Sequence, residues 1–223
     1  RFTDAPTTFA GDMAVNPGGS FNWDLSGASL LITGNVDLNN ANPIELTMMS
    51  VPTVTVSNGG TLDINGKVAV DGAILLPPTG NLLLENNQDV LHILGNDANS
   101  AMQLIGATIA GNGTLKVTGS NLVAGSGTIA VDIDFGNATS LEAAAGTLTI
   151  SGPINNAGTL GTFDATGTLN TPGAFTTANV QQVELKGGQW TGGTITHSSL
   201  LAGHGTVATE VFINDGTIKP DHG

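Results

Sequence analysis

Two peptides decide the fold of this chain: Gly113-Thr114-Leu115-Lys116-Val117-Thr118-Gly119 and its near copy Gly146-Thr147-Leu148-Thr149-Ile150-Ser151-Gly152. In each, aliphatic residues alternate with polar ones, and a glycine at either end permits a sharp turn. Such a segment is a short strand with one buried side and one exposed side. Its opening, Gly-Thr-(Leu, Ile or Val), recurs at Gly60, Gly113, Gly127, Gly146, Gly158, Gly167, Gly193, Gly205 and Gly216. This recurrence predicts a repeat architecture.

Repetition favours a parallel β-solenoid over a sandwich of hairpins. In a solenoid each strand stacks on its equivalent one coil below, so that like side chains form rows through the interior. A sandwich gives its strands no reason to resemble one another. With roughly 20 to 25 residues per coil, we expect an all-β rod of about ten coils, stacked about 4.8 Å apart. The uneven spacing of the Gly-Thr-aliphatic openings indicates loops of different lengths between fixed strands.

The chain divides into two expected regions within one continuous body. Residues 1–42 are the least regular and contain four of the nine aromatic residues, so we expect an irregular N-terminal coil or cap there. Residues 43–223 are expected to form the repetitive solenoid. Within it, the stretch from Asn81 to Leu94 lacks glycine and proline, yet it has no helical apolar stripe. We expect two buried strands in this stretch, with a short helix as the alternative.

Composition excludes several classes of function. Only 10 % of the residues are charged, and 5 basic against 18 acidic residues give a formal net charge of −13. Such a surface repels nucleic acids and anionic lipid headgroups, so neither is expected as a partner. Cysteine is absent, which excludes disulfides, thiolate metal sites and thiol nucleophiles. No apolar run is long enough for a membrane helix, and no N-terminal signal pattern is present; we expect either that an export signal precedes this segment or that the chain never had one.

The C-terminal sequence carries a more specific likeness. It comprises Leu200-Leu201-Ala202-Gly203-His204-Gly205-Thr206-Val207 and Asn214-Asp215-Gly216-Thr217-Ile218-Lys219-Pro220-Asp221. This passage resembles one near the end of many autotransporter-like passenger domains and related bacterial surface β-helix proteins, although Asp221 stands where that family commonly has glycine. The resemblance implies export, a right-handed parallel β-helix and a passive role in adhesion, surface coating or fibre formation. It implies no catalytic residues.

Candidate catalytic residues do not form a complete set. Gly203-His204-Gly205 is similar to a motif of β-helical polygalacturonases, whose sites also need paired aspartates and a basic residue. Only Ile218-Lys219 is faintly similar to that basic segment, and no adjacent Asp-Asp occurs. Because glycan hydrolysis needs two carboxylates that flank the bond, one histidine is insufficient. We therefore expect no enzymatic activity.

Candidate metal and ligand sites are equally incomplete. Asp132 and Asp134 project from one face of a strand, as do Asp63 and Asn65, but hard cations need six or more oxygen ligands. His197 and His204 could share a face, yet no third ligand has suitable spacing. Thr53 and Thr55 place two hydroxyls together, whereas an ice-binding face would need many such pairs. We expect no catalytic, cofactor-binding or metal-binding residues and no cofactor.

The sequence therefore predicts a non-enzymatic, extracellular structural β-solenoid, exported to the cell surface, that serves as an adhesin shaft or a filament subunit. An uncovered end of a stack can pair with any compatible strand, so we expect end-to-end self-association or continuation into further coils. A host or matrix surface ligand is a further expected partner. The alternatives are a polysaccharide-binding or polysaccharide-processing β-helix and the shaft of a viral tail fibre.

Overall fold

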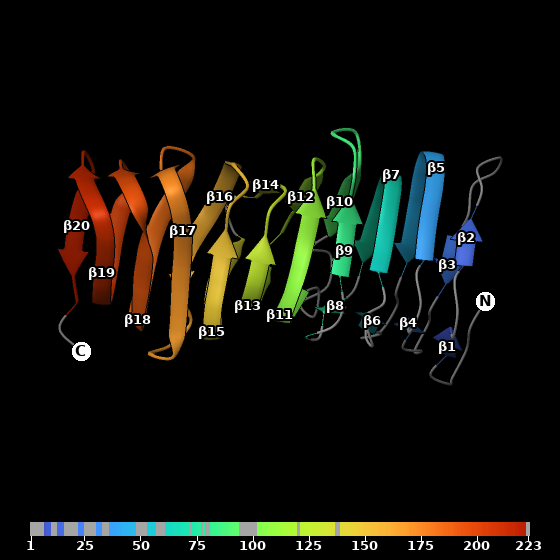
Figure 1. Ribbon diagram of the computed structural model, residues 1–223, viewed down its shortest axis with the longest axis horizontal. Helices are drawn as coiled ribbons and strands as arrows, with labels where there is room; N and C mark the ends of the chain where they lie inside the picture. The colour runs from blue at the N-terminus through green and yellow to red at the C-terminus, as the bar shows by residue number, and fades with distance from the viewer. Residues whose placement is uncertain are drawn as a thin grey trace.

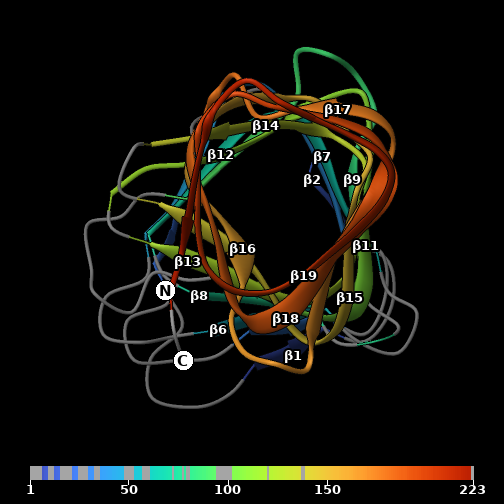
Figure 2. The ribbon, with the colours of Figure 1, turned by 90° about the vertical axis from the view of Figure 1, so that its left-hand side faces the viewer.

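The computed structural model describes the backbone of residues 7–9, 13–15, 22–24, 30–32, 36–47, 53–56, 61–71, 73–76, 78, 81–93, 102–119, 121–136 and 139–221, with side chains from Ile74 onward. These residues form a parallel β-solenoid, as the repetition predicts, and no helix occurs among them. Figure 1 shows a rod whose coils follow one another from the N-terminus to the C-terminus. Figure 2 looks along this rod and shows the coils superimposed around a common axis.

Three faces run along the rod, and the paired positions define them. The first face contains β1 (Thr7–Phe9), β4 (Leu30–Ile32), β6 (Thr53–Val56), β8 (Ala73–Leu76), the starts of β11 (Met102–Gly111), β13 (Leu122–Ile129) and β15 (Ser140–Ile150), the end of β16 (Ile154–Thr162), the starts of β18 (Val180–His197) and β19 (Leu200–Asn214), and β20 (Thr217–Pro220).

The second face contains β2 (Met13–Val15), the starts of β5 (Val36–Thr47) and β7 (Thr61–Asp71), β9 (Asn81–Leu84), the later parts of β11, β13 and β15, the start of β17 (Gly167–Thr176), and the middles of β18 and β19. The third face contains β3 (Asn22–Asp24), the ends of β5 and β7, β10 (Val90–Ile93), β12 (Thr114–Val117), β14 (Asp132–Phe135), the start of β16, and the ends of β17, β18 and β19.

One row of paired residues on the first face traces the winding. It passes through Thr8, Leu31, Thr55, Leu75, Gln103, Ala124, Glu142, Gly161, Glu184, Ala202 and Lys219, each paired in parallel with the next. Six turns separate Gln103 from Lys219 in this row. The four earlier steps lead back to Thr8, in keeping with the roughly ten coils expected. The right-handed winding and the cap at residues 1–42 stay predictions; β1 to β4 and the start of β5 lie in that cap region.

The interior consists of rows of aliphatic side chains, as predicted. On the second face, Leu148 pairs with Leu169, Leu169 with Trp190, and Trp190 with Val207; the first three side chains are fully buried. Burial of each such side chain contributes about 1.5 to 3 kcal/mol. Since each row is shared by successive coils, the core is continuous along the axis, and no coil has a core of its own.

The Gly-Thr-aliphatic openings are distributed over all three faces. Those at Gly146 and Gly167 stack directly on one another, as expected for equivalent strands. The opening at Gly113 instead leads into β12 on the third face, and the one at Gly216 leads into β20 on the first. The motif therefore marks a corner followed by a strand, whichever face that strand joins. This explains why the openings are unevenly spaced in the sequence.

The stretch from Asn81 to Leu94 confirms the prediction of two strands. β9 and β10 occupy it, separated by a turn, and the described residues leave no place there for the alternative helix. Asp89 is buried in the turn, and its carboxylate accepts hydrogen bonds from the backbone N–H and the side-chain amide of Asn86, at 2.7 and 3.2 Å. Asparagine and aspartate thus close the corner through local hydrogen bonds.

Candidate functional site: polar clusters and the C-terminal end

The two histidines considered as a metal pair lie apart. His197 is fully buried, and it belongs to the third face at the end of β18. His204 is exposed on the first face, where it pairs with Lys186 of the preceding coil. The expectation that they share a face is therefore wrong, because a corner of the coil separates them. Among the residues with described side chains, no group of three or more His, Cys, Asp or Glu side chains could hold a metal ion.

Asp132 and Asp134 do project from the same side of β14, but each already has a partner. Lys116 on β12 forms an ion pair with Asp134 at 3.4 Å, and Asn155 donates to Asp132 at 3.5 Å. Lys116 also lowers the pKa of neighbouring His92, as a second cause after partial burial. A lysine beside the carboxylates disfavours a bound cation. Asp63 and Asn65 pair with Asp37 and Asn39 at the backbone level, and their side chains lie outside the described set.

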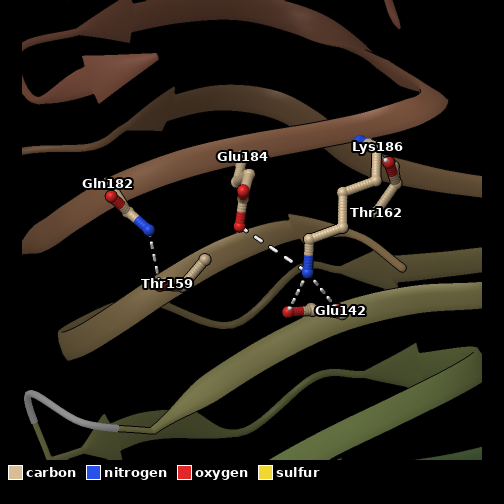
Figure 3. A network of polar contacts seen from close by, with 6 residues as sticks. All are labelled: Glu142, Thr159, Thr162, Gln182, Glu184 and Lys186. Atoms are coloured by element: carbon tan, nitrogen blue, oxygen red, sulfur yellow. Dashed lines mark hydrogen bonds and ion pairs between the residues drawn. The ribbon is translucent and has the colours of Figure 1, made fainter. Parts of the chain in front are cut away.

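An ion pair that joins two non-adjacent coils was not foreseen from the sequence. Glu142 on β15 is largely buried, with 7 % of its side chain exposed, and Lys186 on β18 donates to both of its carboxylate oxygens at 3.2 and 3.3 Å. Glu184 lies 3.6 Å from the same ammonium group. Figure 3 shows Lys186 reaching across the intervening coil toward Glu142.

Gly161 makes this reach sterically feasible. It lies in the row between Glu142 and Glu184, and so it has no side chain between the two carboxylates. A Cβ atom there would lie 1.9 Å from the carbonyl oxygen of Glu184, so the neighbouring coil packs directly on the glycine backbone. Close approach of two backbones is a principal use of glycine in strands. Two further bonds flank the cluster: Gln182 donates to Thr159 at 3.1 Å, and the Lys186 N–H donates to Thr162 at 3.0 Å (Figure 3).

An aromatic cluster fills the interior near the C-terminal end. Trp190 is fully buried and donates its indole N–H to Thr171 at 3.0 Å. Phe175, His197 and Phe212 surround it edge-on, with ring centroids 6.1 to 6.4 Å from its own. Such edge-to-face contacts add about 0.5 to 1.5 kcal/mol each beyond the area that they bury.

His197 occupies an unusual position within this cluster. Its ring stacks on Phe212 at a centroid distance of 5.9 Å, and Nδ1 lies 3.2 Å from the Thr177 hydroxyl. Nε2 is buried without a hydrogen-bond partner among the described residues. Desolvation by burial holds the pKa of the imidazole below its ordinary value of 6.5, although nearby backbone groups of Thr217 and Ser199 oppose the shift. The folded chain therefore favours the neutral ring.

The C-terminal end of the rod exposes the apolar rows that are buried elsewhere. In one row of the first face, Val183 is 0 % exposed, Leu201 is 8 % exposed and Ile218 is 48 % exposed. Val207 and Phe212, which end rows on the other faces, are only partly buried. The side chains of Val207, Phe212 and Ile218 line a hollow of about 630 Å³. His204, Lys219 and Asp221 also line it.

Comparisons with protein-family models, with curated proteins and with solved structures find no match to this chain. Among the described residues, no helix has the length and apolar character needed to cross a membrane.

Proposed function

We propose that this chain is a non-enzymatic structural β-solenoid, exported to the cell surface, that extends a shaft or filament through its C-terminal end. The observation that carries the proposal is the graded exposure of one interior row, from Val183 through Leu201 to Ile218. At the end of the stack this apolar row is about half exposed to solvent. A further coil that covered the row would bury its apolar surface and stabilise the rod. The resemblance of the C-terminal sequence to autotransporter-like passenger domains supports the same role and the same location.

The cover that we propose is a further coil, supplied either by end-to-end association with a second copy or by continuation into further coils. Among the described residues, Thr8, Met13 and Trp23 lie in the strands nearest the N-terminus on the first, second and third faces, and the same three faces reach the coil of β19 and β20. Head-to-tail stacking of two copies would extend these three faces along one axis. Contacts of this heterologous kind repeat without closing, and they generate a filament.

The test is the length of the particles. Electron microscopy and light scattering of the purified chain over a range of concentrations should show rods that grow in length as concentration rises. Ile218→Lys places a charge in the exposed end row and should prevent growth. The matched control Ile105→Lys alters a side chain of similar exposure, 42 %, on the outward side of β11 in the middle of the rod, and growth should persist.

Single short particles at every concentration would overturn end-to-end assembly of copies and would favour a coil supplied by the continuation of a longer chain. Equal loss of growth in both variants would also contradict an end contact. Particles with the mass of a trimer would instead favour the shaft of a viral tail fibre.

A polysaccharide-binding or polysaccharide-processing β-helix is the second candidate. It is favoured by the terminal hollow, because an imidazole, an ammonium group and a carboxylate lie on its rim at His204, Lys219 and Asp221. Binding and hydrolysis of neutral and acidic glycans can be screened directly. A measured activity that is lost in His204→Ala would replace the structural proposal.

A further inference from the structure

His197 lies in the interior of the rod, directly beneath the coil of β19 and β20. Its ring stacks on that of Phe212 in β19, with an angle of 18° between the two planes. The backbone C=O of His197 accepts a hydrogen bond from the N–H of Asp215 at 2.7 Å, and that of Ser199 accepts one from Thr217 at 2.9 Å. The imidazole is therefore buried by the same coil that these backbone bonds hold in place.

The polar groups around the imidazole suit its neutral form. Nδ1 lies 3.2 Å from the Thr177 hydroxyl, which also accepts a hydrogen bond from the Ser198 N–H at 2.9 Å. Nε2 and the buried hydroxyl of Ser199 have no hydrogen-bond partner among the described residues. A protonated ring carries a hydrogen on both nitrogens, so the one on Nε2 would be buried without an acceptor. A buried charge with an unpaired N–H is strongly destabilising.

No carboxylate lies against the ring to compensate for such a charge among the residues with described side chains. The side chains in contact with the ring belong to Thr177, Trp190 and Phe212, which stay neutral in mild acid. On β18, Glu184 and Lys186 lie on the first face and pair with each other. The remaining titratable residues of the adjoining elements are exposed: His204 and Glu210 on β19, Asp215 after it, Lys219 on β20, and Asp221.

We infer that His197 is an acid-sensitive contact that decides whether the coil of β19 and β20 stays packed on the rod. At neutral pH the uncharged ring fills the space between Trp190 and Phe212. In mild acid the ring takes up a proton more favourably once water reaches it, and water reaches it when this coil separates. Local opening of this coil needs less free energy than unfolding of the inner coils, because those have neighbours on both sides.

The consequence for assembly rests on the proposed function, since a further coil would stack on the coil of β19 and β20. Burial holds the pKa of His197 below 6.5, so the stabilising effect of the neutral ring is lost as the pH falls from 6.5 through the folded pKa. Separation of the coil removes the surface on which the next coil stacks. Growth of rods is therefore expected at neutral pH and not in mild acid.

The experiment is hydrogen exchange of the purified chain, followed by mass spectrometry at pH 7 and pH 5 and corrected for the intrinsic pH dependence of exchange. We expect β19 and β20 to lose protection at pH 5 while β13 and β15 keep theirs. His197→Phe retains a ring on Phe212 but cannot take up a proton, and it should preserve protection at both pH values. The matched control His204→Phe removes an exposed histidine of the same coil and should lose protection in acid, as the unaltered chain does.

Circular dichroism at pH 7 establishes that each variant is folded, and His197→Gln, with a neutral amide, is a second variant that should behave like His197→Phe. Equal protection of β19 and β20 at both pH values in the unaltered chain would overturn the inference. So would a loss in acid that persists in the folded His197 variants, or one that extends equally to β13 and β15. Light scattering separates the two proposals: rods that never grow at pH 7 contradict the proposed function, whereas hydrogen exchange alone decides the role of His197.

Discussion

The coils between β11 and β18 and the last coil, formed by β19 and β20, are built from similar strands but differ in what covers them. In the inner coils each aliphatic row has neighbours on both sides, and Leu169, Val183 and Ile195 are fully buried. In the last coil the same rows end in Val207, Phe212 and Ile218, which are partly or largely exposed. The difference shows that burial of an inward-facing residue in this fold depends more on the neighbouring coil that covers it than on the sequence of its own strand.

The largest effect that tests this comparison is expected from Trp190→Ala. The indole is fully buried, and its loss leaves a cavity in the aromatic cluster and removes the N–H group that donates to the Thr171 hydroxyl. We expect the free energy of unfolding to fall by about 3 to 5 kcal/mol. Val207→Ala alters the next residue in the same row and should cost well under half as much, because Val207 is already partly exposed. Urea denaturation measures both, and equal losses would contradict the comparison.

The next effect concerns the direct packing of one backbone on another in the inner coils. Gly161→Ala places a methyl group 1.9 Å from the carbonyl oxygen of Glu184, so the strands must move apart. We expect a loss of about 1 to 3 kcal/mol, the usual cost of overpacking. Gly136→Ala is the control, because the atom nearest to its added methyl, the Cα of Thr118, would lie 3.6 Å away. Thermal unfolding of the two variants should separate them clearly.

A smaller effect is expected from the ion pairs. Lys186→Ala leaves the buried Glu142 carboxylate without its lysine, and we expect a loss of roughly 1 to 2 kcal/mol, since Lys186 itself is 40 % exposed and solvent screens the pair. Lys116→Ala removes a pair in which both side chains are more than a third exposed, and the expected loss is about 0 to 1 kcal/mol. Chemical denaturation in low and high salt would test both values; a larger loss for Lys116 would reverse our ranking.

The smallest effect is a dependence on pH at the boundary between inner and terminal coils. Burial keeps the folded pKa of His197 below 6.5, so the unfolded chain binds more protons in mild acid. Stability should therefore fall as pH decreases from 6.5 through the folded pKa. His197→Phe should reduce this dependence, while His92, whose pKa is also lowered, maintains part of it.

His204→Phe is the control for that measurement, because it leaves the buried imidazole in place. The measurement compares denaturation midpoints at pH 5 and pH 7, which lie on either side of the ordinary histidine pKa of 6.5. Stability that rises toward acid in the unaltered chain would contradict the sign derived from burial.

The architecture could be predicted because the information is local and repeated. Alternating aliphatic residues between glycines predict short strands, and the recurrence of Gly-Thr-aliphatic predicts coils in parallel register; β12 and the later part of β15 confirm both. The absence of a helical stripe likewise predicted β9 and β10 correctly. These inferences need only the period of the pattern and the chemistry of the corners.

The contacts between coils could not be predicted, because they depend on the length of each coil. Glu142 and Lys186 are 44 residues apart, and only the register of β15, β16 and β18 places them on one face. His197 and His204 are close in sequence, yet they lie on different faces because the coil turns a corner between them. The sequence does not specify the angle of that corner.

Trp190 gives this fold a spectroscopic property of practical value. The chain has two tryptophans, and Trp190 is shielded from solvent within the aromatic cluster near the C-terminal end. In a Trp23→Phe background its emission would report this cluster alone. A red shift that precedes the loss of β-sheet ellipticity would reveal that the rod melts from that end, one winding after another.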